Sequence, residues 1–218
     1  MYRIIKRIFD ILIAGIALVL LSPILVPVIL ILLFTGEREV FYLQQRIGYK
    51  KKAFGIWKFA TMVKNSPNMG TGEITLRNDP RVTPFGKFLR ISKINELPQI
   101  INVFTGDMSI VGPRPLMPVS FKLYDPAVQE KIYDSKPGMT GIGSLLFRDE
   151  EKLLSDAADP KAMYAAIYPY KGELEMWYLR NASFWTDLKI IFLTAWSILF
   201  PKNNLTQQFF QDLPQRNF

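Results

Sequence analysis

The sequence predicts an α/β fold, mostly helical with a small sheet, held at a membrane surface by a re-entrant helix–break–helix. Three observations support this prediction. Residues 11–34 carry no charged side chain, and prolines interrupt that run near its middle. The chain beyond residue 36 alternates short strand-like segments with helical ones. We expect a membrane segment over residues 1–36 and a single further domain over residues 37–218.

The uncharged run is long enough for a transmembrane helix, but its prolines oppose a straight one. Such a helix would reach roughly 36 Å, against about 30 Å of hydrocarbon. Pro23 removes the hydrogen bond to the carbonyl of Val19, at a cost of about 3 kcal/mol, and Pro27 repeats the effect one turn later. Each half alone would span only ~18 Å. We therefore expect a break at Ser22 and Pro23, with the Ser22 hydroxyl bonding back to Leu18.

Basic residues flank the run on both sides. They are Arg3, Lys6 and Arg7 before it, and Arg38, Arg46, Lys50, Lys51 and Lys52 after it. The positive-inside rule keeps both ends cytoplasmic, which a re-entrant helix satisfies. A kinked helix that spans the bilayer is the alternative. A cleaved signal peptide is disfavoured because the run is too long and no small-x-small site follows.

The remaining elements follow from local pattern and from breakers. Strand-like segments are expected at 40–43 and 53–59, a loop at 64–80 and 136–143, and helices at 85–92, 96–103, 119–135 and 149–171, the last facing solvent. A C-terminal helix is expected at about 183–200, where Asp187 and Lys189 oppose a transmembrane course. It fits an interfacial amphipathic helix or, alternatively, a core-facing one.

Composition limits the chemistry. With 27 Lys and Arg against 19 Asp and Glu the net charge is +8, which suits anionic partners. No nucleic-acid-binding motif is present, so an anionic leaflet or a phosphorylated substrate is favoured. The chain has no Cys and no His. Disulfides, thiolate and histidine nucleophile systems, and His- or Cys-bound zinc are therefore excluded. Carboxylates, Lys, Arg and a hard cation such as Mg²⁺ remain.

The densest run of informative residues lies between Ser92 and Pro115. Gly112–Pro115 reads Gly-Pro-Arg-Pro, so prolines fix φ on both sides of Arg114, whose planar guanidinium suits phosphate. Before it come Gly-Asp-Met-Ser at 106–109 and Glu-Leu-Pro-Gln at 96–99. Further motifs are Gln-Arg-Ile-Gly at 45–48, Lys-Phe-Ala-Thr-Met at 58–62, Asp-Pro-Arg-Val-Thr at 79–83 and Lys-Pro-Gly-Met-Thr-Gly at 136–141.

These motifs resemble the monotopic phosphoglycosyl transferases, a family of bacterial sugar transferases, in their small form. The resemblance covers most of residues 1–143 and returns at 187–189. It implies a polyprenyl-phosphate phosphoglycosyl transferase that moves a phosphosugar from a UDP-sugar to undecaprenyl phosphate. It also implies a cytoplasmic, membrane-surface catalytic domain on the bacterial inner membrane, and a product that starts a capsule, exopolysaccharide or O-antigen glycan.

The resemblance also implies site residues. Phosphate or nucleotide contacts fall on Arg46, Lys58, Arg90 and Arg114, Mg²⁺ binding on Glu96 and Asp107, and the membrane break on Ser22 and Pro23. The catalytic pair is Asn95 and Glu96. The sugar is not determined, because residues 142–146 leave the family pattern, and the oligomeric state, a homo-oligomer included, is open.

Asn95 departs from the family, which has Asp-Glu where this chain has Asn-Glu. The resemblance implies that the Asp attacks the β-phosphate and carries the phosphosugar. A neutral amide oxygen cannot do this. Three interpretations follow. The chain is a natural variant that attacks with Glu96 or lets the lipid phosphate attack directly, an inactivated form, or a non-catalytic, membrane-anchored nucleotide-sugar-binding relative.

Overall fold

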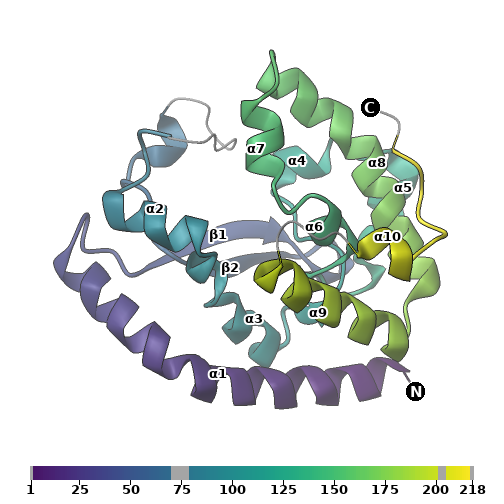
Figure 1. The fold of residues 1–218 in the computed structure, drawn as a ribbon, viewed down its shortest axis with the longest axis horizontal. Coiled ribbons are helices and arrows are strands. Elements are labelled where there is room, and N and C mark those ends of the chain that lie inside the picture. The colour runs from purple at the N-terminus through teal and green to yellow at the C-terminus, as the bar shows by residue number, and fades with distance from the viewer. Residues whose placement is uncertain (1, 70–78, 201–204, 217–218) are drawn as a thin grey trace.

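The computed structural model describes residues 2–69, 79–200 and 205–216. It is mostly helical with two small sheets, as the sequence predicts (Figure 1). The strands are β1 (Phe41–Ile47), β2 (Ala53–Phe59), β3 (Ser109–Val111) and β4 (Gly138–Thr140). The helices are α1 (Tyr2–Phe34), α2 (Pro84–Ile91), α3 (Gln99–Thr105), α4 (Pro118–Phe121), α5 (Pro126–Lys131), α6 (Ile142–Leu146), α7 (Glu150–Ser155), α8 (Pro160–Asn181), α9 (Phe184–Leu199) and α10 (Thr206–Phe209). Short 3-10 turns are η1 (Tyr49–Lys51), η2 (Ser66–Asn68), η3 (Ile94–Glu96) and η4 (Ile132–Asp134).

Helix α1 is continuous through both of its prolines. Figure 1 shows it curving along one side of the molecule, so the expected break is a bend without an interruption of the helix. The Ser22 hydroxyl donates to the carbonyl of Val19 at 2.7 Å, not to Leu18 as expected. Val19 is the residue whose carbonyl Pro23 leaves without an amide partner. The serine thus satisfies the group that the proline frees, and the helix continues.

Helix α1 contacts the body of the protein near both of its ends. Near its start, Arg7 donates to the Val103 carbonyl of α3 at 2.6 Å. Closer to the middle of the helix, Ala14 packs in a core cluster with Ile100 and Val103. Val28 and Leu32 pack in another, with Phe59 of β2 and Leu89 of α2. By length and composition α1 could cross a membrane, but its contacts at both ends lay it along the body. Its outer face is apolar and exposed, at Ile4, Ile8, Leu12, Ile16, Val19, Leu20, Leu30 and Leu33 among others.

Two small sheets bring the informative motifs together. Strands β1 and β2 form an antiparallel hairpin, with Phe41 opposite Phe59 and Ile47 opposite Ala53. Strands β3 and β4 pair in parallel, with Ser109 beside Gly138. A Cβ on Gly138 would lie 2.1 Å from the amide nitrogen of Gly112, so glycine is required there. The Pro-Gly motif thereby lies directly against the Gly-Pro-Arg-Pro turn.

Three predicted segments differ from the structure. The expected 119–135 helix is divided into α4, α5 and η4, where prolines begin α4 and α5. The expected 149–171 helix is divided into α7 and α8, and its assignment to solvent is wrong, because α8 buries Ile167, Tyr168, Lys171 and Leu174. The expected 136–143 loop contains β4 and the start of α6. Residues 70–78 of the expected 64–80 loop lie outside the described part of the chain.

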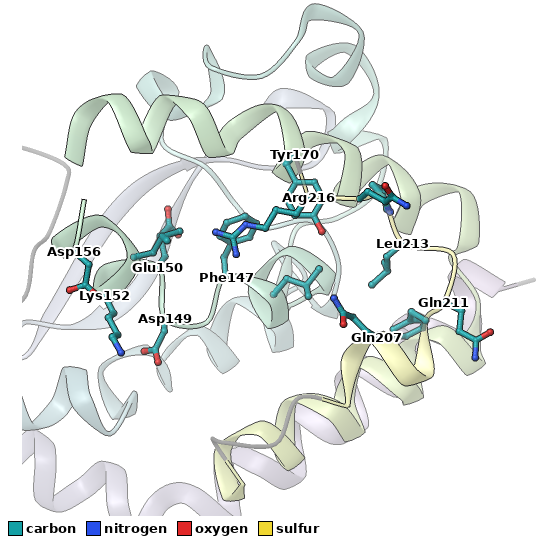
Figure 2. Close-up of a pocket in the computed structure, with 15 residues that line it drawn as sticks. Phe147, Asp149, Glu150, Lys152, Asp156, Tyr170, Gln207, Gln211, Leu213 and Arg216 are labelled. Atoms are coloured by element: carbon teal, nitrogen blue, oxygen red, sulfur yellow. The ribbon is translucent and has the colours of Figure 1, made fainter. Parts of the chain in front are cut away.

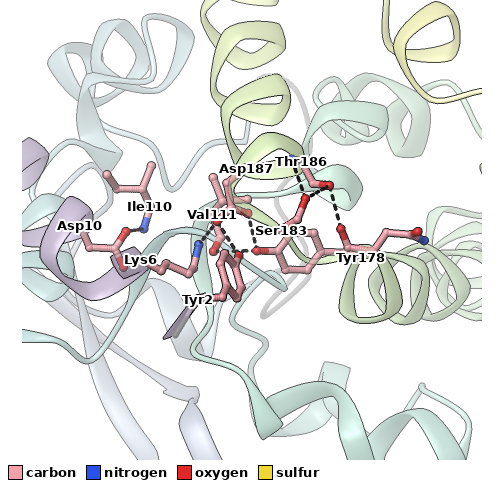
Figure 3. Close-up of polar contacts among 10 residues, drawn as sticks. Tyr2, Lys6, Asp10, Ile110, Val111, Tyr178, Ser183, Thr186 and Asp187 are labelled. Atoms are coloured by element: carbon pink, nitrogen blue, oxygen red, sulfur yellow. Dashed lines mark hydrogen bonds and ion pairs between the residues drawn. The ribbon is translucent and has the colours of Figure 1, made fainter. Parts of the chain in front are cut away.

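Helix α9 packs one side in the core and exposes apolar side chains on the other, so its interfacial role stays a prediction. Ile190 and Leu193 lie in the core, whereas Trp185, Phe192, Ile198 and Leu199 are exposed. Asp187 is buried and accepts hydrogen bonds from Lys6 Nζ at 2.5 Å, the Tyr2 hydroxyl at 2.7 Å and the Tyr178 hydroxyl at 2.8 Å (Figure 3). This cluster ties the start of α1 to α8 and α9.

Candidate active site

The candidate site lies where the β1–β2 hairpin meets the turn between α2 and α3. Asn102 of α3 fixes that contact, because its side chain accepts from the Trp57 amide at 2.9 Å and donates to the Gly55 carbonyl at 2.8 Å. Glu96, in the turn before α3, is thereby held beside the end of β2. Its Oε1 lies 3.3 Å from Lys58 Nζ.

Three cations predicted from the sequence share this region. Arg46 and Lys58 lie on the same face of the hairpin, because Phe54 opposite Arg46 is four residues from Lys58. Arg46 donates through Nη1 to the carbonyl of Pro115 at 3.2 Å, which places it against the Gly-Pro-Arg-Pro turn. The charge of Arg114 acts on Arg46, Lys58 and Glu96 alike. The structure thus brings Arg46, Lys58, Glu96 and Arg114 together.

Electrostatics set the protonation states of this group. Burial raises the pKa of Glu96, but Lys58, Arg114 and Lys93 outweigh it and hold the value at about 2. Burial lowers the pKa of Lys58 to about 8 despite Glu96. Burial, and then Arg114, lowers the pKa of Arg46 to about 10. At neutral pH the site therefore carries three positive charges and one negative charge, an arrangement that favours a polyanion.

The backbone of Arg114 is clamped by two buried side chains. The Tyr133 hydroxyl donates to the Arg114 carbonyl at 2.9 Å and accepts from the Leu116 amide at 2.9 Å. Glu175 of α8 accepts from the Arg114 amide at 3.3 Å. Burial raises the pKa of Glu175 to about 7, and its Oε2 has no hydrogen-bond partner. These contacts add to the stiffness expected from the flanking prolines.

Two predicted site residues make their side-chain contacts outside this group. Arg90 of α2 has its Nη2 3.9 Å from Glu151 of α7, and a nucleotide contact for it stays a prediction. Asp107 is exposed and accepts from the Thr105 hydroxyl at 3.0 Å. It follows α3, whereas Glu96 precedes it, so roughly 10 Å of helix separates them. The structure does not bring the two predicted Mg²⁺ ligands into one site.

The donor set for a cation is therefore small. Among the described residues no cluster of three or more His, Cys, Asp or Glu side chains could hold a metal ion. Glu96 is the accessible carboxylate of the cationic group. Mg²⁺ is commonly bound through one or two carboxylates together with substrate phosphates and water. The residues thus fit a Mg²⁺ ion that is shared with a bound diphosphate.

Asn95 and Glu96 differ sharply in access. Asn95 is 6% exposed, and its Oδ1 is buried without a hydrogen-bond partner. The Glu96 side chain, one residue later in the same turn, is 31% exposed and faces Lys58. The residue in the family's nucleophile position points inward, whereas its neighbour reaches the cations.

Helix α8 contributes buried polar residues that sequence reasoning missed. Lys171 Nζ pairs with Glu150 Oε1 at 2.6 Å and lies 5.0 Å from the ring centre of Tyr168. Positions 164, 168, 171 and 175 share one helix face by spacing. That spacing of Tyr, Tyr, Lys and Glu was the available signal. It was overlooked because charged residues are normally assigned to solvent.

A separate groove of about 670 Å³ lies between the α6–α7 segment, Tyr170 of α8 and the C-terminal segment. Figure 2 shows its lining, with Phe147 and Tyr170 on one side and Gln207 and Leu213 on another. Glu96 and Arg114 do not line it. Its acidic wall includes Glu150, the partner of Lys171.

The sequence of the chain is similar to those of several known bacterial proteins. The chain is 35% identical over 203 residues to the exopolysaccharide production protein ExoY of Sinorhizobium fredii, covering 87% of this chain and 83% of that protein. It is 35% identical over 196 residues to the UDP-glucose:undecaprenyl-phosphate glucose-1-phosphate transferase of Escherichia coli K12, covering 88% of this chain and 40% of that protein.

A further relative is the UDP-N-acetylgalactosamine-undecaprenyl-phosphate N-acetylgalactosaminephosphotransferase of Aeromonas hydrophila, 34% identical over 200 residues, which are 91% of this chain and 44% of that protein. The chain thus spans about two fifths of the length of several of these curated relatives. The sequence model of the bacterial sugar transferase family matches residues 1–201. The chain therefore belongs to the bacterial sugar transferase family.

Proposed function

We propose that this chain transfers a phosphosugar from a UDP-sugar to a polyprenyl phosphate, and that undecaprenyl phosphate is the acceptor. The product, a lipid-linked diphosphosugar, would start a bacterial surface glycan such as an exopolysaccharide, capsule or O-antigen. The observation that carries the proposal is the grouping of Glu96 with Arg46, Lys58 and Arg114, on a body that α1 lines with exposed apolar side chains. The names of the relatives agree with this reaction.

The cationic group supplies what a diphosphate requires. Phosphoryl transfer is catalysed mainly by positioning and by neutralising charge on the phosphate oxygens. Arg114 offers a planar pair of donors from a clamped backbone, and Lys58 offers a compact charge beside it. Arg46 supports the same turn through the Pro115 carbonyl. These residues would hold the diphosphate of the nucleotide sugar while the phosphorus is attacked.

We also propose Mg²⁺ as the cofactor, with Glu96 as its protein ligand. When bound, Mg²⁺ would neutralise diphosphate charge and favour departure of the nucleotide. Asp107, at the other end of α3, is a weaker candidate ligand and would require a rearrangement to join Glu96. Glu96 is ionised throughout the physiological pH range, as a magnesium ligand must be.

The acceptor side of the proposal rests on α1. Its exposed apolar face would lie in the cytoplasmic leaflet of the inner membrane, with the bend at Ser22 and Pro23 returning the chain to the same side. Exposed Trp185 and Phe192 of α9 would add an interfacial contact. A polyprenyl phosphate, whose tail is confined to the bilayer, could then present its phosphate at the protein surface.

Release of UMP tests the proposal. The purified chain is placed in lipid nanodiscs with undecaprenyl phosphate and Mg²⁺, and given UDP-glucose, UDP-galactose or UDP-N-acetylgalactosamine. We expect UMP from at least one sugar and its loss in Arg114→Ala. Arg180→Ala, which changes an exposed arginine of α8, serves as the matched control and should keep the rate. Absence of UMP with all three sugars would reject the proposed transferase function.

Asn95 is the feature that favours the second candidate, a non-catalytic membrane-anchored binder of nucleotide sugars. Asn95→Asp separates the two. If the native chain releases no UMP and the variant does, the native protein is a silent binder. If the native chain releases UMP without the Asn95→Asp substitution, the proposed transferase function is supported.

A further inference from the structure

We propose that Glu96, and not residue 95, is the nucleophile of this chain, and that it carries the phosphosugar as an acyl phosphate. The inference rests on the proposed function and deepens it. It concerns the point where this sequence departs from its family, at Asn95.

Access to the phosphate-binding cations separates the two neighbouring side chains. Asn95 is 6% exposed, and its Oδ1 is enclosed without a partner. Its amide is also neutral, and amides do not form the acyl phosphates that carboxylates form. Glu96 follows in the same 3-10 turn, is 31% exposed, and has its Oε1 3.3 Å from Lys58 Nζ. One turn of the chain therefore hides the amide and presents the carboxylate.

The other carboxyl groups near Arg114 are occupied or enclosed. Among the described residues, Glu150 and Glu175 join Glu96 in acting on the charge of Arg114. Glu150 is bound to Lys171 at 2.6 Å, and the Lys171 side chain is itself only 7% exposed. Glu175 is 2% exposed and accepts from the backbone amide of Arg114. Glu96 has the most exposed side chain of the three, at 31% against 22% for Glu150, and its lysine contact at 3.3 Å is longer than the 2.6 Å contact of Glu150.

The reaction balances with this residue. A Glu96 carboxylate oxygen attacks the β-phosphorus of the UDP-sugar. The bond from that phosphorus to the bridging oxygen breaks, and UMP leaves with the electron pair. A phosphate oxygen of the polyprenyl phosphate then attacks the same phosphorus. The carboxyl–phosphorus bond breaks, and Glu96 returns as a carboxylate. No proton, oxidant or reductant is required from another source.

The ion pair with Lys58 is compatible with attack. A bound diphosphate brings more negative charge to Lys58 and Arg114 than the single carboxylate does, so Lys58 can turn from Glu96 to the phosphate. The same cation would then hold the electrophile and release the nucleophile.

The direct test uses the unmodified chain. The protein in nanodiscs without polyprenyl phosphate is given Mg²⁺ with UDP-glucose, UDP-galactose or UDP-N-acetylgalactosamine. We expect at most one UMP per chain and a covalent sugar phosphate, which peptide mass spectrometry places on Glu96. Hydroxylamine should remove the adduct and leave a hydroxamate at that residue. An adduct on any other residue would overturn the assignment.

Variants separate the nucleophile from a metal ligand. Glu96→Gln should lose UMP release by on the order of 10⁴-fold, at every Mg²⁺ concentration. Recovery at high Mg²⁺ would mean that Glu96 only binds the ion and would refute the proposal. Glu173→Gln, which changes an exposed carboxylate of the same chain, should keep both the adduct and the wild-type rate. Circular dichroism verifies that each variant is folded. If a variant is not folded, the position of the adduct on the wild-type chain decides between the two roles of Glu96.

Two remaining outcomes are distinguishable. UMP that appears only when polyprenyl phosphate is added, with no adduct, would show direct attack by the lipid phosphate, so the Glu96 proposal would fail while the proposed function survives. No UMP under any condition would reject both.

Discussion

Lys58 gives the site a pH limit that activity measurements can detect. Burial lowers its pKa to about 8, so the amine loses its charge as pH rises through that value. A charge-assisted hydrogen bond contributes roughly 1.5–3 kcal/mol. We therefore expect kcat/KM for the UDP-sugar to fall about tenfold or more between pH 7 and pH 9.5.

Lys58→Arg provides the control for this limit, because a guanidinium stays protonated over the whole range. The variant should be weaker at pH 7 but nearly flat up to pH 9.5. An identical alkaline fall in both proteins would assign the limit to another group.

The raised pKa of Glu175 predicts that the stability of the folded protein depends on pH. Burial raises its pKa from 4.5 to about 7, so the folded protein holds a proton that the unfolded chain releases between these values. The free energy of unfolding therefore falls as pH rises from 4.5 to 7, by roughly 3 kcal/mol in total. Glu175→Gln removes this penalty while keeping an acceptor for the Arg114 amide.

Thermal unfolding at two pH values checks this prediction. Relative to wild type, Glu175→Gln should gain several degrees more at pH 8 than at pH 5, because wild-type Glu175 is largely protonated at pH 5. Equal differences at both pH values would contradict a raised pKa. Glu173→Gln, an exposed change two residues away, should show no such pH dependence.

Site residues that lie in short sequence motifs could be predicted, whereas residues that reach the site only through long-range contacts could not. Arg114 and Glu96 lie in short motifs in which prolines and glycines fix the local backbone. Glu175 and Tyr133 act on Arg114 through contacts across 61 and 19 positions, and no local pattern specifies such pairs. Asp107 and Glu96 flank the seven residues of α3, a separation that the sequence motifs alone did not reveal, and their sharing of one Mg²⁺ stays a prediction.

At the scale of elements, the anchor between α1 and α9 can be measured. Lys6 and Asp187 form a pair with side chains 17% and 7% exposed, supported by the Tyr2 and Tyr178 hydroxyls. Removing one partner of a buried pair costs roughly 3–5 kcal/mol. Asp187→Asn should therefore lower Tm by roughly 10 °C and loosen the start of α1 toward proteolysis.

A double-mutant cycle that combines Lys6→Met with Asp187→Asn measures the coupling free energy between these two side chains. The coupling free energy should exceed that of Lys64 and Glu39, an ion pair whose side chains are 61% and 51% exposed. Exposed pairs contribute about 0–1 kcal/mol. Simple additivity for Lys6 and Asp187 would show that the contact does not hold α1 in place.

Element prediction succeeded where periodicity and breakers agreed. The start of β1, the whole of β2, and helices α2, α3 and α9 were expected from the sequence, whereas the pairing of β1 with β2 was not. Strands β3 and β4 have three residues each, too few for a period to be read. Helix α8 was assigned to solvent because its charged residues dominate the pattern, whereas tertiary pairing buries Lys171 with Glu150.

At the scale of the whole molecule, the contacts of α1 predict how the protein would meet a bilayer. Arg7 contacts α3 near one end of the helix, and Val28 and Leu32 pack against α2 near the other, so both ends are held on one body. A re-entrant helix therefore predicts that both ends face the same aqueous compartment. The natural chain contains no cysteine, so single cysteines can be introduced without a background.

Labelling of Arg3→Cys and Glu37→Cys with an impermeant maleimide tests this topology. Both should react in inverted inner-membrane vesicles and neither in intact spheroplasts. Leu20→Cys, at a position 70% exposed on the apolar face, should stay protected in both until detergent is added. Reaction of the two ends from opposite sides would establish a transmembrane helix.

The fate of the β-phosphorus tests the central claim most directly. A UDP-sugar labelled with ³²P at the β-phosphate is incubated with the chain, Mg²⁺ and undecaprenyl phosphate in nanodiscs. Transfer of a phosphosugar predicts that the label enters the lipid fraction while unlabelled UMP is released in equal amount. Label that leaves as UDP, or that stays in intact nucleotide sugar, would contradict the account.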